Sequence, residues 1–186
     1  DIDGVMIRYT LVEGQSPVTL RLAPFLAYRG YHSLSKANTY ASKKFTEIPN
    51  GIKLRLYNGY SDLHLQTSRI SEYVSVPDWH YNFEYMREKE RGYDFQEDLF
   101  CPGYFEFEMK KGEQFYFSAS LEELSPRSLK SLFDHETQSR LPFSSFENCL
   151  INSASQFIVQ RDKKTEVVAG YHWFGRWGRD TFIALP

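Results

Sequence analysis

The sequence predicts a mainly β protein in which an antiparallel β-sandwich is followed by a helical connector. Over most of the first 120 residues, apolar residues alternate with polar ones, as in strands that bury one face. Aromatic residues make up 17% of the chain, with 13 Tyr and 15 Phe, which suits a large β-rich core or a surface on which a flat ligand stacks. After residue 120 the apolar spacing becomes that of a helix.

The first predicted strands show the alternation directly. In GVMIRYTLV, which begins at residue 4, one face carries Val5, Ile7, Tyr9 and Leu11. In PVTLRLAPFLAYRG, which begins at residue 17, one face carries Val18, Leu20 and Leu22. Since successive side chains of a strand point to opposite faces, each pattern predicts a strand with one side in the core.

Two hairpins are predicted next. In IKLRLYNGYSDLHLQ, which begins at residue 52, Ile52, Leu54 and Leu56 alternate with polar residues and would share one face. Asn58-Gly59 can then adopt the positive φ angles of a two-residue turn. In YFEFEMKKGEQFYFSA, which begins at residue 104, Lys111-Gly112 is the predicted turn. Its two strands would turn the same face to the core, with Phe105, Phe107, Met109, Phe115 and Phe117. Both segments therefore predict neighbouring antiparallel strands.

Two helices and a short hairpin are predicted after residue 120. In SPRSLKSLF, Ser125 is a candidate N-cap and Pro126 takes the first helical position. In SSFENCLINSASQF, Ser144 and Glu147 have the spacing of a capping box. FIVQRDKKTEVVAG predicts a strand, a charged turn and a strand. We therefore expect a β-sandwich domain at 1–120, a helical connector at 121–156, and a last part at 157–186.

Charge and composition limit the partners of the chain. The net charge is −2, with acidic and basic residues interleaved, so a nucleic-acid surface is not indicated. No apolar run has the length of a membrane span. Cys101 and Cys149 lie far apart without metal-ligand spacing, which favours free thiols in a reducing, cytoplasmic compartment, with one disulfide as the alternative. We expect no metal and no organic cofactor.

The densest polar and aromatic chemistry lies in the last stretch, GYHWFGRWGRDTFIALP. An indole ring can stack on the C–H face of a pyranose, while a neighbouring arginine and aspartate hold its hydroxyls by charge-assisted hydrogen bonds. Candidate sugar-binding residues are therefore Trp173, Trp177, Arg179 and Asp180. In the alternative interpretation, the tryptophans belong to a core and Asp180 caps a helix that begins at Thr181.

A second acidic group lies in ERGYDFQEDLF, which begins at residue 90 and contains Arg91, Glu97 and Asp98. Adjacent side chains of a strand point to opposite faces, so Glu97 and Asp98 are not expected to act together on one bond. We expect this segment either to lie at a domain interface, bordering an active-site entrance, or to be a solvated loop.

Two further segments are candidates for glycan or interface contacts. YRGYHSL brings Tyr28, Arg29 and His32 together after a strand; the alternative is a polar loop whose groups bond to the backbone. DWHYNFEY alternates strictly and predicts one strand face with Trp79, Tyr81, Phe83 and Tyr85. If exposed, that face would be a stacking platform for a glucan, and if buried it would form half of a sandwich core.

Several stretches resemble one known family. AGYHWFGRWGRDTFIALP resembles the junction motif of the bacterial and archaeal-type glycogen debranching enzymes, the amylo-α-1,6-glucosidases. LRLAPFLAYRGYHSLSKAN at 20–38, ERGYDFQEDLFCPGYF at 90–105 and SASQFIVQR at 153–161 resemble the same family in the same order. Ser155 departs from the pattern, because an aspartate is expected there.

The resemblance implies a supersandwich-like N-terminal domain, a helical connector and a catalytic (α/α)6 barrel that begins near the terminal motif. It implies that Trp177, Arg179 and Asp180 bind the glucose unit at the cleavage subsite. It also places the catalytic carboxylates further along, so that this chain alone would hold no catalytic residue and would be inactive. The expected partners are glycogen or another branched α-glucan, and the catalytic domain of the same chain. An independent glucan-binding module and a purely structural domain are the alternatives.

Overall fold

The computed structural model describes residues 2–30, 32–161, 164–170 and 174–184. The chain forms two compact units, Asp1–Phe133 and Asp134–Pro186. The first unit contains two antiparallel sheets and the start of a helix, and the second contains helices and a small sheet. The mainly β, antiparallel character expected from the alternating pattern is therefore confirmed.

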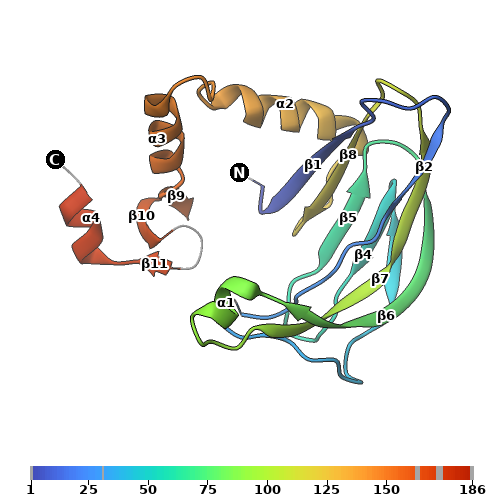
Figure 1. Ribbon diagram of the computed structural model, residues 1–186, viewed down its shortest axis with the longest axis horizontal. Helices are drawn as coiled ribbons and strands as arrows, with labels where there is room; N and C mark the ends of the chain where they lie inside the picture. Colours follow the sequence, from blue (N-terminus) through green and yellow to red (C-terminus); the bar gives the residue numbers. More distant parts are fainter. Residues whose placement is uncertain (1, 31, 162–163, 171–173, 185–186) are drawn as a thin grey trace. The chain divides into compact units, whose positions relative to one another are not determined.

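The larger sheet of the first unit has five strands, in the order β1-β8-β5-β4-β3. Their bounds are Gly4–Thr10 for β1, Phe45–Ile48 for β3, Gly51–Leu54 for β4, Leu63–Thr67 for β5 and Gln114–Ser120 for β8. The first strand of the chain pairs with the last strand of the sandwich, so that Gly4 lies opposite Ser120. The strands are coloured by their position in the chain in Figure 1.

The smaller sheet has three strands, in the order β2-β7-β6. Their bounds are Val18–Leu22 for β2, Glu72–Glu84 for β6 and Gln96–Met109 for β7. A short helix, α1 (Met86–Glu90), joins the two long strands β6 and β7.

The two sheets enclose one hydrophobic core. Phe100, Phe105 and Phe115 are almost fully buried, and the rings of Phe107 and Phe115 stack at 3.7 Å between centroids. Because β7 and β8 belong to different sheets, that stack joins the two layers. Each fully buried Phe stabilises the fold by about 1.5–3 kcal/mol relative to an exposed one. The high aromatic content therefore serves mainly to fill a sandwich core.

The alternation in the predicted strands identifies most inner-face residues. Ile52, Leu54 and Leu56 are at most 4% exposed, as expected. Val5 and Ile7, by contrast, are 55% and 41% exposed. They lie on the edge strand β1 of the five-stranded sheet, whose Tyr9, further along the strand, packs against the core.

The hairpin predicted at 104–119 is wrong. β7 and β8 do not pair with each other, because the turn around Gly112, with φ 83°, carries the chain from one sheet to the other. β7 pairs with β2 and β6, and β8 pairs with β1 and β5. The predicted inward face is nevertheless present, since Phe105, Phe107, Phe115 and Phe117 are all buried. Two consecutive strands show the same alternation of apolar and polar residues whether they pair as a hairpin or cross between facing sheets.

The two-residue turn predicted at Asn58-Gly59 is also wrong. β4 and β5 do pair as antiparallel strands, but residues 55–62 connect them, and only Gly59 of the predicted pair has a positive φ, 87°. The tight connection lies instead between β3 and β4, where Ile48 pairs with Gly51 and Asn50 has φ 51°. Asparagine tolerates this left-handed conformation better than most residues.

The single aromatic face predicted for DWHYNFEY is wrong as well. The pairing of β6 with β7 shifts register between His80 and Phe83, where Asn82 has φ 60°. Trp79 therefore packs on Phe100 in the core, with ring centroids 5.4 Å apart, while Phe83 contacts Phe25 outside it. An inserted residue in one strand reverses the faces beyond it.

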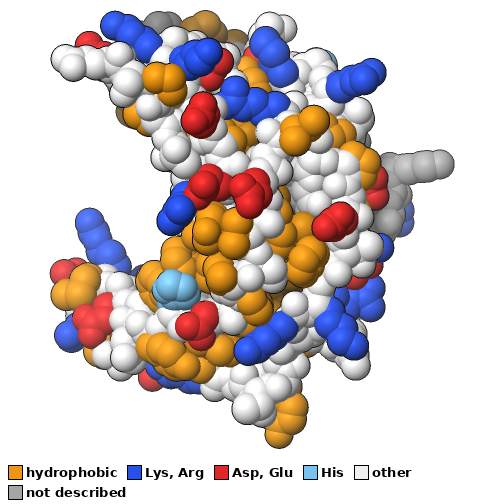
Figure 2. Space-filling view, turned by 90° about the vertical axis from the view of Figure 1, so that its right-hand side faces the viewer, with side chains coloured by type: hydrophobic (Ala, Val, Ile, Leu, Met, Phe, Trp, Pro, Cys, Tyr) orange, Lys and Arg blue, Asp and Glu red, His pale blue; other side chains and the backbone are white. Residues whose placement is uncertain are grey.

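The outward side of β6 and β7 carries its own ring cluster. Phe25, which is 44% exposed, makes edge contacts with His80 and Phe83 at 4.7 and 5.3 Å between centroids. Figure 2, which faces the side on which β2, β6 and β7 lie in Figure 1, shows hydrophobic side chains gathered near the centre of this face. Acidic side chains and a histidine lie at the margin of this group.

The helices begin close to their predicted starts. A 3-10 turn at Pro126–Ser128, with Ser125 in the preceding position, leads into α2 (Leu129–Ser139), and Leu129 is fully buried. The N-cap of α3 (Phe146–Ser155) is Ser145 rather than the predicted Ser144, because the Ser145 hydroxyl accepts the N–H of Asn148 at 3.2 Å.

The second unit has a three-stranded sheet, in the order β11-β10-β9. Its strands are Ile158–Arg161 (β9), Lys164–Gly170 (β10) and Phe174–Arg176 (β11), and α4 (Gly178–Ala184) follows. The predicted strands of FIVQRDKKTEVVAG are confirmed by the pairing of β9 with β10, and the predicted turn at 162–163 lies outside the described residues. None of the described helices is long and apolar enough to cross a membrane.

Candidate functional site

Glu97 is the centre of a buried polar cluster near the start of β7. Its carboxylate is fully buried and accepts hydrogen bonds from Nε and Nη2 of Arg29 at 2.6 and 2.9 Å. The N–H and hydroxyl of Ser35 donate to it at 3.0 and 2.9 Å, and the hydroxyl of Tyr85 donates at 2.6 Å. Five donors from three separate segments therefore meet on one carboxylate.

The neighbouring carboxylate, Asp98, has a different set of partners. It accepts the backbone N–H of Ala37 at 3.0 Å and that of Asn82 at 2.9 Å. Its own backbone N–H donates to the carbonyl of Ser35 at 2.9 Å. Asp98 thus holds the 35–37 segment on one side and the register shift in β6 on the other.

These contacts shift the ionisation of both acids in the same direction. Burial alone would raise the pKa of Glu97, but the hydrogen bonds from Arg29, Tyr85 and Ser35 outweigh burial and hold the pKa at about 2. The backbone N–H groups of Ala37 and Asn82 lower the pKa of Asp98. Burial and the bond to Glu97 raise the pKa of the Tyr85 phenol. Both carboxylates stay ionised and fully bonded at neutral pH.

Glu97 and Asp98 therefore stabilise the fold and do not have the properties of an acid–base site. A general acid must hold a proton near the working pH and reach a substrate, and neither carboxylate does so. The other candidates of this region lie around the cluster. Tyr28 is half-buried and contacts the carbonyls of Leu54 and Ser61 at 3.4 Å, His32 is exposed, and Arg91 pairs with Glu88.

The terminal motif is exposed to solvent, in contrast to the buried cluster around Glu97. Trp177 is 52% exposed, and Arg179 and Asp180 are exposed at the start of α4. Among the described residues, neither Arg179 nor Asp180 has a hydrogen-bond or ion-pair partner. α4 begins at Gly178, so Asp180 lies inside its first turn instead of capping a helix that starts at Thr181. Trp173, the fourth predicted member, lies outside the described residues.

The motif offers three complementary groups in four residues. Trp177 presents an indole ring, Arg179 presents N–H donors and Asp180 presents acceptors. The adjacent Arg176 is already paired with Glu166 at 2.5 Å, so it is not equally available. Phe182 and Ile183 on α4 are 80% and 78% exposed. A motif of this composition can bind a polyhydroxylated ring, with the indole on its C–H face and the charged pair on its hydroxyls.

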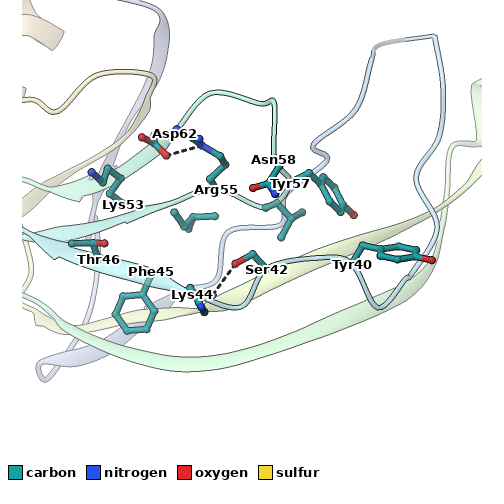
Figure 3. A pocket seen from close by; sticks show the side chains of 12 residues that line it. Tyr40, Ser42, Lys44, Phe45, Thr46, Lys53, Arg55, Tyr57, Asn58 and Asp62 are labelled. Atoms are coloured by element: carbon teal, nitrogen blue, oxygen red, sulfur yellow. Dashed lines mark hydrogen bonds and ion pairs between the residues drawn. The ribbon is translucent and has the colours of Figure 1, made fainter.

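Sequence reasoning missed a cleft of about 700 Å³ in the first unit. It lies along β3 and β4 and the residues that flank them, and Figure 3 shows its side chains. The rings of Tyr40, Phe45 and Tyr57 line it together with polar and charged groups. The remaining lining residues are Ser42, Lys44, Thr46, Lys53, Leu54, Arg55, Leu56, Asn58 and Asp62.

One signal for this cleft was present in the sequence. The segment KLRLYNGYSD predicts a strand and a turn, and its outward positions carry Lys53 and Arg55 and are followed by Asp62. The other wall, residues 40–46, carries Tyr40 and Lys44 with no strong strand pattern. Only the pairing of β3 with β4 brings the two segments together.

The described residues hold no cluster of three or more His, Cys, Asp or Glu side chains suited to a metal ion. Cys101 is buried and Cys149 is partly exposed, and both are free thiols. Burial raises the pKa of the Cys101 thiol, which makes it a poor nucleophile.

Together, these features define an antiparallel β-sandwich protein with an exposed Trp-Arg-Asp group of the residue types that bind sugars. The family model described as glycogen debranching enzyme N terminal matches residues 2–116, more than half of the chain. The chain belongs to this family, as the resemblance of its motifs indicated. A second family model, amylo-alpha-1,6-glucosidase, matches residues 152–186. No curated protein and no solved structure matches the chain.

Proposed function

We propose that this chain is the non-catalytic N-terminal portion of a glycogen debranching enzyme that hydrolyses α-1,6-glucosidic branch points. The observation that carries the proposal is the order of the two family matches, the N-terminal family at 2–116 and the amylo-alpha-1,6-glucosidase family at 152–186. The substrate is then glycogen or another branched α-glucan. The two free cysteines agree with a cytoplasmic location.

The three parts expected from the sequence take different roles in this proposal. The sandwich at 1–120 supports the catalytic barrel, the connector at 121–156 leads to it, and residues 157–186 contain its first elements. Glycoside hydrolysis needs one carboxylic acid and one carboxylate on either side of the scissile bond. We assign neither to this chain, because Glu97 and Asp98 are fully bonded within the sandwich.

The terminal motif binds the terminal glucose unit in this proposal. Arg179 and Asp180 have no partner among the described residues, so their hydrogen-bonding capacity remains for hydroxyl groups. Trp177 stacks on the sugar or forms a wall of the subsite, and Trp173 contributes a second ring. A charge-assisted hydrogen bond contributes about 1.5–3 kcal/mol, which corresponds to about 10- to 100-fold in affinity.

The region around α1 is the proposed contact with the catalytic domain. Tyr81, Met86 and Tyr93 are 62%, 55% and 64% exposed, although they lie beside a firmly bonded cluster. Exposed apolar groups gathered on a rigid support are typical of an interface. The 28–32 loop is fixed to the same support through Arg29, so Tyr28 and His32 would border that interface.

A purely structural role for the sandwich is the second candidate, and one observation favours it. Arg29, Glu97 and Asp98 are used entirely within the fold, so these candidate glycan contacts are not free to bind a ligand. The independent glucan-binding module, as first expected, depended on an exposed Trp79. The indole N–H of Trp79 donates to the carbonyl of Asn38 at 3.1 Å and its ring packs on Phe100, so this residue is not a platform.

The test is kinetic and uses an enzyme that contains this chain. Asp180→Asn and Arg179→Lys should each lower kcat/KM for glucose release from a branched dextrin by about 10- to 100-fold, since Asn carries no charge and Lys lacks the paired N–H donors of the guanidinium. Arg176→Lys is the matched control, because Arg176 lies in the same motif but pairs with Glu166. Unchanged kinetics in both variants would refute the assignment of the motif.

A further inference from the structure

Four tyrosine side chains gather at one end of the cleft along β3 and β4. We call them the tyrosine cluster: Tyr28, Tyr40, Tyr57 and Tyr60. The ring centroid of Tyr60 lies 5.8 Å from that of Tyr28 and 6.1 Å from that of Tyr57. Tyr40 and Tyr57 line the cleft, and in Figure 3 they lie at the same end of it, whereas Lys53 lies at the other. The cleft therefore has an aromatic end.

A turn with the sequence YNGY positions two of these rings. The backbone N–H of Tyr60 donates to the carbonyl of Tyr57 at 3.4 Å, which closes a four-residue turn. Gly59 within the turn has φ 87°, a conformation that glycine adopts without strain. Although these residues do not form the predicted hairpin turn, they bring the rings of Tyr57 and Tyr60 together.

One asparagine fixes Tyr40 relative to Tyr57. The side-chain amide of Asn38 donates to the Tyr57 hydroxyl at 2.8 Å. The Asn38 side-chain oxygen accepts the backbone N–H groups of Tyr40 and Ala41 at 3.0 and 3.1 Å. The backbone carbonyl of Asn38 accepts the indole N–H of Trp79 at 3.1 Å. Because Trp79 and Tyr57 both pack against the core, the backbone of Tyr40 is tied to the sandwich.

Two rings of the cluster are open to solvent, and the other two support them. Tyr40 is 85% exposed and Tyr60 is 46% exposed, whereas Tyr28 and Tyr57 pack against the core. Tyrosine offers a large contact area with only two side-chain torsions to restrain, so a ligand that stacks on it loses little of its binding free energy to ordering. The exposed rings are therefore suited to binding.

The polar groups at this end suit the hydroxyls of a neutral sugar. Arg55 Nε donates to Asp62 at 3.0 Å, and the side chains are 45% and 34% exposed. This pair is neutral as a whole, and its remaining N–H groups and carboxylate oxygen can form charge-assisted hydrogen bonds with hydroxyls. The exposed side-chain amide of Asn58 has no hydrogen-bond partner among the described residues. A sugar can thus bind these groups while its C–H face stacks on a ring.

The tilt of the rings favours a curved ligand. The ring plane of Tyr60 makes an angle of 59° with that of Tyr28 and with that of Tyr57, so the cluster is not a flat platform. Successive glucose units of an α-1,4-linked chain turn along a helical curve, whereas those of a β-1,4-linked chain form a flat ribbon. The cleft volume of about 700 Å³ lies within the range of about 300–1,000 Å³ that is typical of ligand sites.

We propose that the tyrosine cluster binds a run of α-1,4-linked glucose units, such as an outer chain of a branched α-glucan. The rings of Tyr40 and Tyr60 cover the C–H faces of glucose units, while Asn58 and the pair of Arg55 and Asp62 bind their hydroxyls. The identity of the ligand rests on the proposed function. The cluster adds a second contact with that polymer, in the first unit of the chain, whereas the terminal motif belongs to the second unit.

The experiment is calorimetric titration of the chain, with Arg179→Ala and Asp180→Ala in place so that these terminal groups do not contribute. The ligands are maltopentaose and cellopentaose, which have the same length and differ in the linkage. Maltopentaose should bind about tenfold or more tightly than cellopentaose. Its affinity should not change when the salt concentration is raised, because the ligand is neutral.

Variants of Tyr40 connect this binding with the cluster. Tyr40→Ala should weaken maltopentaose binding about 3- to 10-fold, because it removes one stacking ring, and Tyr40→Phe should retain the affinity. Tyr93→Ala is the matched control, since Tyr93 is 64% exposed and lies outside the cleft lining. Lys53→Gln is the control at the other end of the cleft. Melting curves would verify that each variant folds.

Three outcomes would overturn the proposal. No binding of maltopentaose would exclude the site, and equal affinity for cellopentaose would exclude a site shaped for a curved chain. Unchanged affinity in Tyr40→Ala would place the binding elsewhere. The proposed function is tested separately, because the kinetic effect of Asp180→Asn depends on the terminal motif. Failure of either test therefore leaves the result of the other standing.

Discussion

Two sets in this chain each combine an arginine with a carboxylate, and they differ completely in structure. Arg29 and Glu97 lie 68 positions apart and form a bidentate ion pair, with the carboxylate at 0% exposure. Arg179 and Asp180 are adjacent, exposed and without partners among the described residues. The first set is fully used by the fold, and the second keeps its hydrogen-bonding capacity.

The difference shows how the same residue types serve stability in one place and recognition in another. A buried ion pair is stable only when every remaining donor and acceptor is satisfied. Ser35 and Tyr85 donate the further hydrogen bonds that the Glu97 carboxylate needs. A binding residue must instead leave groups unsatisfied in the free protein, which only solvent exposure permits. Partner count and burial therefore separate the two roles, and residue identity does not.

The largest effect on stability is expected when the buried carboxylate is removed. Glu97→Gln should lower the free energy of unfolding by about 3–5 kcal/mol, because it leaves the Arg29 guanidinium without its counter-ion in a largely buried place. Urea denaturation measures the change. Glu136→Gln is the matched control, since Glu136 pairs with Arg140 on the exposed surface, where such a pair contributes about 0–1 kcal/mol. Equal losses in the two variants would contradict the account.

Acid should have the next largest effect. The pKa of Glu97 is about 2 in the folded chain and near 4.3 when unfolded, so its contribution is fully present above about pH 5. It is lost progressively as the pH falls from about 5 through the folded pKa to about 1, and the total loss is about 3 kcal/mol. Urea midpoints recorded across this range should fall steeply in the wild type and less steeply in Glu97→Gln. Parallel curves would remove Glu97 as the cause.

Replacing the half-buried indole should cost somewhat less. Trp79→Ala removes the packing on Phe100 and the bond to the Asn38 carbonyl, with an expected loss of about 2 kcal/mol, below the 3–5 kcal/mol of a fully buried aromatic. Tyr40→Ala, at an 85% exposed ring, should change stability by less than about 0.5 kcal/mol. Thermal melting compares the two. A large loss in Tyr40→Ala would show that its ring is part of the fold.

The smallest effect on stability is expected at the terminal motif. Arg179→Ala with Asp180→Ala should change the free energy of unfolding by less than about 0.5 kcal/mol, because no described residue depends on these side chains. The same pair should weaken glucan turnover in an enzyme that contains this chain. A marked fall in stability would show that both residues stabilise the fold, as Glu97 does.

The fold could be predicted as far as local spacing determines it. Alternation at Ile52, Leu54 and Leu56 identified the inner face, and Pro126 marked the start of a helix. Alternation does not encode which sheet a strand joins, so the crossing at Gly112 was mistaken for a hairpin. Nor does it reveal an inserted residue, and the shift near Asn82 placed Trp79 and Phe83 on different sides.

The candidate sites were predictable to the extent that their residues are adjacent. Arg179 and Asp180 lie in one short motif, so their chemistry could be recognised directly. Two of the three partners of Glu97, Arg29 and Ser35, lie more than 60 positions away, and only the folded sheet shows that its carboxylate is satisfied. The β3–β4 cleft needed the same long-range information, because its two walls meet through strand pairing.

The pairing of Gly4 with Ser120 also has a consequence for how the protein folds during synthesis. β1 leaves the ribosome before the other described strands of the sandwich, yet its sheet neighbour among the described residues is β8, the last of these strands. Until that strand emerges, Val5 and Ile7 have no ladder beside them and form an open edge that can recruit another nascent chain. Strand pairing over such a separation is slow, since loop closure comes before any contact is gained. The order of strands therefore delays the pairing of β1 until β8 has been synthesised.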